Sequence, residues 1–169
     1  MRLSNSRIDY RLRLLPGAGG IAQTIRVMRQ CVEFYKSHPR IIEVARNIVM
    51  LAPPKDQLAE VVAVFEYVRD QIRYVADPLD VETLTTPDRL IDEGAGDCDD
   101  KSTLLATLLA AIGIDSEFVV TGYTDNTNYE HVYVLAYVSS VRVALDPCEL
   151  QPAGWQPPRP TIYTLERNL

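Results

Sequence analysis

Three residues in the C-terminal half of the chain carry the side chains that a thiol-dependent acyl transfer needs. Cys98 lies within "GAGDCDDKSTLLATLLAAIGI", His131 begins "HVYVLAYV", and Asp146 lies near the end of "VRVALDP". A cysteine attacks a carbonyl carbon as a thiolate, so it needs a base that removes its proton. The imidazole in turn needs an acid that holds it in the correct tautomer. These residues are far apart in the sequence, so the fold must bring them together.

Cys98 is placed at the beginning of a helix. Apolar residues recur at helical spacing over about 98–112, Asp97 is positioned as the N-cap, and Gly113 follows the last turn. A first-turn thiol gains from the helix dipole, which lowers its pKa, and from unpaired N–H groups that can bind an oxyanion. Asp97, Asp99 and Asp100 oppose this effect, although we expect Asp99 on the solvated side. A nearby imidazolium would offset their charge.

His131 and Asp146 are predicted to meet across a hairpin. Residues 131–138 alternate so that His131 and Tyr133 share one face of a strand. If 139–140 is a two-residue loop, Tyr133 lies opposite Asp146, and His131 is the diagonal neighbour of Asp146 on the same face. The alternation therefore predicts a bond between Asp146 and one ring nitrogen of His131.

The remaining pattern predicts an α+β fold, with N-terminal helices packed on a C-terminal antiparallel sheet. We expect helices over 21–35, 39–51, 58–72 and 98–112, and strands over 8–14, 116–123, 131–138 and 141–147. "PGAGG" is predicted to be a turn and 76–96 a long loop. We interpret residues 1–169 as a single domain: a helical N-terminal extension (1–60), a catalytic core (61–147) and an extended, proline-rich tail (148–169).

The composition is typical of a soluble globular protein. The 169 residues are 47% hydrophobic and 24% charged, without an apolar run of membrane-spanning length. "MRLSNSRIDYRLRLLPG" lacks the continuous apolar segment of a signal peptide. Three widely spaced cysteines without a CxxC pair are typical of a reducing compartment. We therefore expect a cytoplasmic protein without a membrane partner.

Charge is distributed unevenly along the chain. Residues 1–46 hold nine basic and three acidic side chains, whereas 47–169 hold eight and twenty. The basic residues are interleaved with apolar ones and do not cluster, so they are only a weak indication of nucleic-acid binding. We expect the basic segment to pack against the acidic remainder, and we expect a protein or peptide substrate and no nucleic acid as partner.

The motifs around the three residues resemble those of the transglutaminase-like superfamily, whose fold is related to papain-like cysteine proteases. "GDCDDKSTLLATLLAAIGI", "HVYVLAYV" and "VALDP" occur in the family's order, and the resemblance runs over 61–147, including "IRYVADP" and "TTPDRLIDEGAGDC". It implies Cys98 as nucleophile, His131 as base and Asp146 as orienting acid, without cofactor or metal. Small single-domain relatives also occur among phage and prophage proteins. Tyr133 stands where the family usually has Trp, and Leu135 where it often has an acidic residue. These departures concern the substrate groove more than the catalytic residues.

Several functions stay open at this point. Water would resolve the thioacyl intermediate as in a protease or amidase, and an amine as in a transglutaminase; we favour hydrolysis because a small domain has little material for an amine channel. Cys148 falls opposite His131 on the hairpin register, so a zinc site is an alternative, using Cys98, His131, Asp146 and Cys148. A calcium site at Asp97, Asp99 and Asp100 has the wrong spacing for an EF-hand. A non-catalytic binding domain is the remaining alternative.

Overall fold

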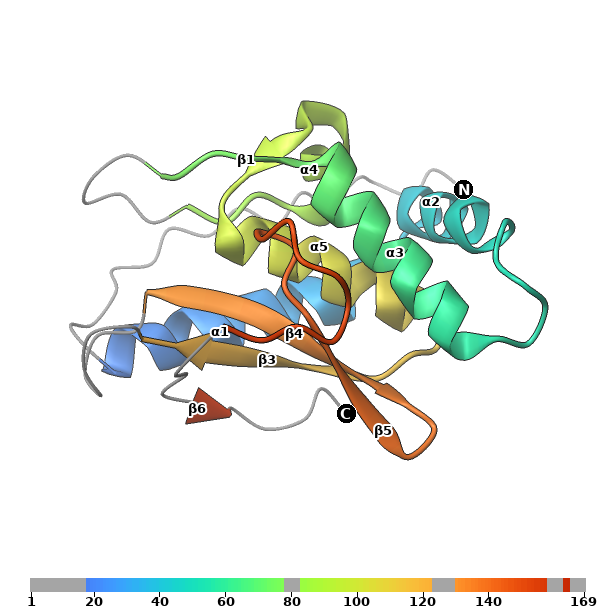
Figure 1. The fold of residues 1–169 in the computed structure, drawn as a ribbon. Coiled ribbons are helices and arrows are strands. Elements are labelled where there is room, and N and C mark those ends of the chain that lie inside the picture. Colours follow the sequence, from blue (N-terminus) through green and yellow to red (C-terminus); the bar gives the residue numbers. More distant parts are fainter. Residues whose placement is uncertain (1–17, 78–82, 123–129, 158–162, 165–169) are drawn as a thin grey trace, which may run out of the picture.

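Helices occupy the N-terminal half of the chain and an antiparallel sheet the C-terminal half, as Figure 1 shows for the computed structural model. The structure describes residues 18–77, 83–122, 130–157 and 163–164. The helices are α1 (Ala18–Tyr35), α2 (Pro39–Val49), α3 (Gln57–Gln71), α4 (Pro87–Glu93) and α5 (Cys98–Ala111). The strands are β1 (Arg73–Tyr74), β2 (Ala95–Gly96), β3 (Ser116–Thr121), β4 (His131–Val138), β5 (Val141–Leu145) and β6 (Tyr163–Thr164). The predicted α+β class is confirmed.

The main sheet has the strand order β5-β4-β3-β6, and every neighbouring pair is antiparallel. Val138 pairs with Val141 across a two-residue loop, so the register predicted for the hairpin is confirmed. Ser139 in this loop has φ 54°, the left-handed conformation that tight hairpin turns use. β6, which the sequence did not predict, pairs with β3 through Thr164 and Val119.

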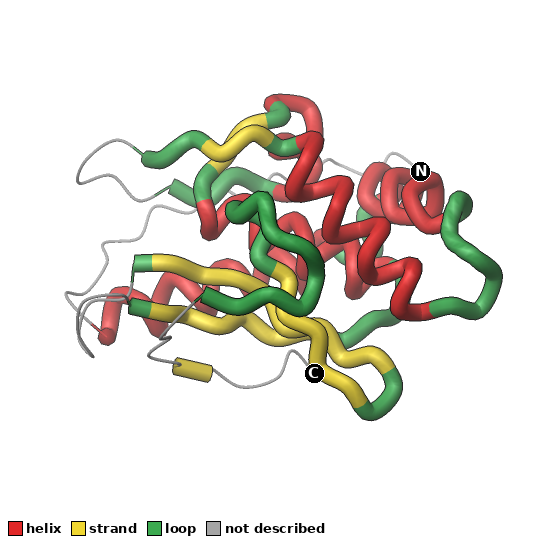
Figure 2. The backbone as a smooth tube through the Cα atoms, viewed as in Figure 1, coloured by secondary structure: helices red, strands yellow, loops and turns green. Residues whose placement is uncertain are grey.

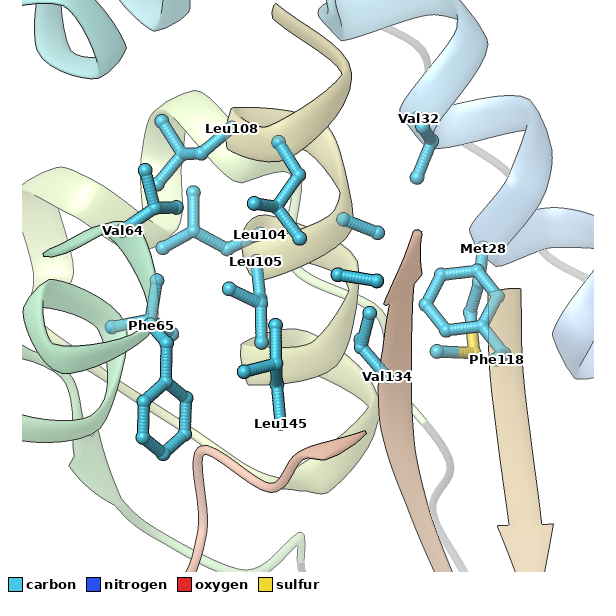
Figure 3. Packing of buried hydrophobic residues seen from close by; sticks show 14 of the residues in the cluster. Met28, Val32, Val64, Phe65, Leu104, Leu105, Leu108, Phe118, Val134 and Leu145 are labelled. Atoms are coloured by element: carbon cyan, nitrogen blue, oxygen red, sulfur yellow. The ribbon is translucent and has the colours of Figure 1, made fainter. Parts of the chain in front are cut away.

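α5 is the central helix of the molecule. It packs against the other four helices on several sides and against β3 and β4 of the sheet. Residues 100–109 of α5 are all buried, which explains why the second half of this helix carries leucine and alanine on all sides. Figure 3 shows side chains of α5 between those of α3 and the sheet; the labelled ones are Leu104, Leu105, Leu108, Val64, Phe65 and Val134. Burial on all sides fixes the position of the first turn, where Cys98 lies.

The prediction of a continuous loop over 76–96 was wrong. This segment contains α4 and β2, and β2 pairs in parallel with β1 to form a separate two-stranded sheet (Figure 2). The signals were present: Thr86 is the N-cap, Pro87 is the first residue of the helix, and Gly94 ends it with φ 65°. Seven helical residues are too few to show a periodicity.

Two further predictions concern the ends of the chain. The turn predicted at "PGAGG" was wrong in its second half, because α1 begins at Ala18. The strand predicted over 8–14 lies outside the described residues. Beyond β5 the chain runs to residue 157 without a helix or strand, and the N–H of Gly154 donates to the carbonyl of Ala144 at 2.7 Å. In the described ranges, each helix is too short or too polar to cross a membrane.

Candidate active site

The first turn of α5 is fixed by two aspartates. Oδ1 of Asp97 accepts from the N–H of Asp100 at 3.1 Å, and Oδ2 of Asp100 accepts from the N–H of Asp97 at 3.4 Å. This reciprocal capping box satisfies two backbone donors at the helix start. The predicted N-cap is therefore confirmed, and Cys98 occupies the first helical position.

Two glycines precede Cys98 for different structural reasons. Gly94 adopts the left-handed conformation that ends α4. Gly96 leaves no room for a side chain, because an added Cβ would lie 2.7 Å from Cβ and Oδ2 of Asp100 and 2.8 Å from Cδ1 of Leu90. The sequence "GAGDC" thus ends one helix and lets the chain pass closely over the first turn of the next.

Contacts with Val132 attach the beginning of α5 to β4. The backbone N–H of Val132 donates to the thiol sulfur of Cys98, and one turn later Oγ of Ser102 donates to the Val132 carbonyl at 3.0 Å. Both polar groups of one peptide residue therefore bond to a single face of α5. Because Val132 follows His131 in the chain, these bonds place the nucleophile candidate beside the base candidate.

His131 and Asp146 form the bond that the alternation predicted. Nε2 of His131 lies 2.7 Å from Oδ2 of Asp146, and their side chains are 11% and 1% exposed. The other carboxylate oxygen of Asp146 accepts from the N–H of Cys148 at 3.1 Å. The buried Tyr133 stacks on the imidazole, with ring centroids 6.4 Å apart. Since Nε2 is engaged with Asp146, proton exchange with a thiol has to use Nδ1.

The pKa of Cys98 is shifted upward, whereas the position at the helix start predicted a lowered pKa. Burial raises the pKa of its thiol well above the ordinary value, and the charges of Asp99, Asp97 and Cys148 raise it further. The bond from Val132 lowers this pKa but does not compensate. Asp99 was wrongly placed on the solvated side, since its Oδ1 lies 3.7 Å from the sulfur. Burial and the neighbouring carboxylates therefore favour the protonated thiol over the thiolate.

A buried cation lies behind the candidate site. Lys101 is 2% exposed, and its Nζ donates to the carbonyl of Ile72 at 2.6 Å and to that of Arg69 at 3.3 Å. Burial lowers the pKa of Lys101, whereas the nearby charges of Cys148 and Asp146 raise it. The sequence analysis missed Lys101. Residues three apart are neighbours on one face of a helix, so the spacing from Cys98 could have indicated it.

Asp100 connects α5 to the segment that precedes α4. Its Oδ1 accepts from the N–H of Thr85 at 2.6 Å, while its other oxygen belongs to the capping box. Burial is the main reason why the pKa of this carboxyl is raised to about 7, and the charge of Asp97 adds to the shift. Asp100 therefore has a structural role at the helix start and titrates near neutral pH.

Tyr74 is a second residue that the sequence analysis missed. It lies directly across the small sheet from Gly96, two residues before Cys98, and is 50% exposed. Partial burial raises the pKa of its hydroxyl, and the charges of Cys98 and Cys148 raise it further. The resemblance includes Tyr74 within "IRYVADP", but a two-residue strand shows no alternation from which its neighbours could be predicted.

The other two cysteines are in different surroundings. Cys31 is 5% exposed in the core, where burial raises its pKa to about 11. Cys148 is half-buried and lies beyond the end of β5 at Leu145, so it is not paired with His131 in the ladder. Across the described ranges, three or more His, Cys, Asp or Glu side chains nowhere converge as metal ligands. The zinc and calcium alternatives thus gain no geometric support.

The sequence model of the transglutaminase-like superfamily matches residues 43–160, a wider span than the 61–147 of the motif resemblance. The match covers the first turn of α5, the β4–β5 hairpin and the segment containing β1. No curated protein matches the chain significantly in sequence.

Solved structures with the same fold come from several bacteria. A candidate protease of Parabacteroides distasonis aligns with a TM-score of 0.58 at 15% identity, covering 82% of this chain and 27% of that one. A candidate cysteine protease of Cytophaga hutchinsonii gives 0.56 at 16% identity, with coverages of 81% and 46%. Calcium-bound LapG of Legionella pneumophila gives 0.55 at 18% identity, with coverages of 85% and 82%. The chain thus spans less than half of the first two proteins, and the likeness establishes a shared fold.

Proposed function

Because the chain belongs to the transglutaminase-like superfamily, we propose that it catalyses thiol-dependent acyl transfer at an amide bond of a protein or peptide. Cys98 is the nucleophile, His131 the base and Asp146 the orienting acid. The observation that carries this proposal is the 2.7 Å bond between His131 and Asp146. It is made next to Val132, whose backbone N–H donates to the Cys98 sulfur.

The first step begins from the protonated thiol. Nδ1 of His131 takes the proton as the Cys98 sulfur attacks the carbonyl carbon, forming a C–S bond and moving the π electrons to oxygen. The imidazolium that results is stabilised by Asp146, whose carboxylate is almost fully buried. The oxyanion can accept from the N–H of Cys98, which has no intrahelical partner at the first helical position, and from the hydroxyl of Tyr74.

The tetrahedral intermediate then expels the amine. The C–N bond breaks, its electron pair takes the proton from Nδ1 of His131, and a thioester with Cys98 remains. In the hydrolytic branch, His131 removes a proton from water as the water oxygen attacks the thioester carbonyl. The C–S bond breaks, the carboxylic acid leaves, and the proton on His131 returns to the thiolate, so the resting thiol is restored.

Hydrolysis is our proposal for the second half-reaction, which makes the protein a protease or amidase. Two proteins that share the fold are described as candidate proteases, and this is compatible with hydrolysis. A transglutaminase would instead let an amine attack the same thioester. The two outcomes share every step up to the acyl-enzyme and differ only in the acceptor.

The proposal is tested with a mixture of peptides from a digested bacterial proteome. Wild-type protein should generate new peptide termini, and Cys98→Ala, which removes only the sulfur, should generate none. Parallel reactions contain dansylcadaverine as an amine acceptor. Incorporation of the dansyl group at glutamine without cleavage would replace hydrolysis by transamidation. Equal peptide profiles for wild type and Cys98→Ala in both reactions would leave a non-catalytic binding domain.

A further inference from the structure

One buried charge behind the candidate site has no part in the chemistry proposed above. Lys101 is 2% exposed, and its Nζ donates to the carbonyl of Ile72 at 2.6 Å and to that of Arg69 at 3.3 Å. A buried ammonium is unfavourable unless hydrogen bonds and opposite charges compensate for the water that it loses. The ammonium of Lys101 therefore fixes the geometry of the two backbone carbonyls that it binds.

Both carbonyls belong to the end of α3. The last four carbonyls of a helix have no partner within the helix. The N–H of Arg73 would bond to the Arg69 carbonyl if α3 continued, but it donates to the carbonyl of Gly94 at 2.8 Å instead. Nζ of Lys101 takes the place of this missing donor, and the helix dipole also favours a cation at the C-terminal end. Lys101 thus stabilises the point at which the chain leaves α3 and begins β1.

This junction determines where Tyr74 lies relative to Cys98. Tyr74 comes two residues after Ile72, whose carbonyl Lys101 binds. In the small sheet Tyr74 pairs with Gly96, two residues before Cys98. Partial burial raises the pKa of the Tyr74 hydroxyl, and the charge of Cys98 raises it further, as expected for neighbouring groups. The first turns of α5 therefore carry both the nucleophile and the cation that fixes the strand of Tyr74.

We propose that Lys101 is a positioning residue for the acyl transfer: its ammonium fixes the junction between α3 and β1 so that the hydroxyl of Tyr74 donates to the oxyanion formed at Cys98. This inference rests on the proposed function and gives a task in it to a residue outside the triad. The oxyanion develops only as the thiol attacks, so the contribution of Lys101 falls on kcat and leaves peptide binding unchanged. Because Lys101 acts through the Tyr74 hydroxyl, its effect disappears where that hydroxyl is absent.

The test compares variants at positions 101 and 74 with a peptide that wild type cleaves. Lys101→Met keeps a long side chain and removes the ammonium, whereas Lys101→Arg keeps a charge and hydrogen-bond donors. Tyr74→Phe removes only the hydroxyl, and a double variant combines it with Lys101→Met. Lys36→Met is the matched control, because it removes a partly exposed lysine whose Nζ pairs with Glu33 at 2.7 Å. Both kcat and KM are measured for each protein, with circular dichroism and the thermal midpoint as folding controls.

We expect Tyr74→Phe to lower kcat by about 10- to 100-fold, at or below the effect of one lost oxyanion-hole donor in other enzymes. Lys101→Met should lower kcat by at most the same factor, with KM little changed. Lys101→Arg should recover most of that loss, and Lys36→Met should match wild type. The double variant should be no slower than Tyr74→Phe alone, because both substitutions remove the same interaction.

Losses that multiply in the double variant, a loss confined to KM, or a folded Lys101→Met with the kcat of wild type would each overturn the inference. If Lys101→Met does not fold, Lys101→Gln takes its place in the comparison, since it is uncharged and one bond shorter but keeps N–H donors, and the same results decide. Failure of the proposed function looks different: wild type and Cys98→Ala would then turn over the peptide equally, and the inference would fall with it.

Discussion

Replacing Asp146 by asparagine should nearly abolish turnover while leaving the fold intact. The carboxylate has two partners, the N–H of Cys148 at 3.1 Å and Nε2 of His131 at 2.7 Å. In Asp146→Asn the amide oxygen is needed by the Cys148 N–H, which directs the amide NH2 toward Nε2. Nε2 must then accept, so the ring proton moves to Nδ1. The imidazole would no longer be able to take the proton of Cys98.

The size of the effect follows from the loss of the base. The equivalent substitution in a serine protease lowers kcat by roughly ten-thousandfold, and burial of the Asp146 side chain argues for a loss approaching that value here. The assay compares peptide cleavage and Cys98 alkylation by iodoacetamide between pH 6 and 10. Circular dichroism and the thermal midpoint establish whether the variant is folded.

Asp99→Asn is the matched control, since it also neutralises one carboxylate close to the site. Asp99 raises the pKa of the Cys98 thiol, and its Oδ1 lies 3.7 Å from the sulfur. Removing this charge should increase the thiolate fraction and accelerate alkylation by about tenfold if the pKa falls by one unit. The two variants are thus expected to change reactivity in opposite directions. An unchanged profile for Asp146→Asn in a folded protein would refute the assigned role of the His131–Asp146 bond.

Three further outcomes follow from the structure. Limiting iodoacetamide should label Cys98 before Cys148 and the buried Cys31, because His131 is positioned to take the proton of Cys98. The labelling rate of Cys98 should still rise above pH 9, because burial and carboxylates hold the pKa of its thiol above the ordinary value; a plateau near pH 7 would indicate a preformed thiolate. Gly96→Ala should cost about 1–3 kcal/mol of unfolding free energy, seen as a lower thermal midpoint, because the added methyl clashes at the start of α5. The pKa of Asp100 is raised to about 7 in the folded state, so between pH 4 and 7 the folded state holds one proton more than the unfolded state, and the protein loses stability as the pH rises. Relative to Asp100→Asn, wild type should lose on the order of 2–3 kcal/mol of unfolding free energy between pH 5 and 8, measured by chemical denaturation. A difference between the two proteins that stays constant with pH would contradict the raised pKa.

Local patterns were sufficient to predict the parts of the site that depend on short-range rules. The alternation of β4 and a two-residue loop at 139–140 determined the register, and the register placed His131 beside Asp146. An aspartate before an apolar helix likewise located the N-cap at Asp97. Both results depend on residues close in sequence, where turn geometry and capping chemistry leave few alternatives.

Features that depend on the tertiary structure could not be predicted in this way. β1 and α4 are too short to show periodicity, so the sequence pattern assigned Tyr74 to no helix, strand or loop. The burial of Lys101 depends on α3 supplying carbonyl groups from a distant part of the chain. The direction of the Cys98 pKa shift required the burial of the thiol and the position of Asp99, and neither follows from the helix-start rule alone.

The central claim is that Cys98 carries the acyl group, and the most direct test is to isolate that intermediate. Wild-type protein is mixed with a peptide that it cleaves, quenched in acid within milliseconds to seconds, and digested for mass spectrometry. The account predicts an acyl fragment of the substrate attached to Cys98, removed by neutral hydroxylamine as expected for a thioester, and absent from Cys98→Ala. Turnover that persists in Cys98→Ala, or an acyl group found on Cys148 instead, would contradict it.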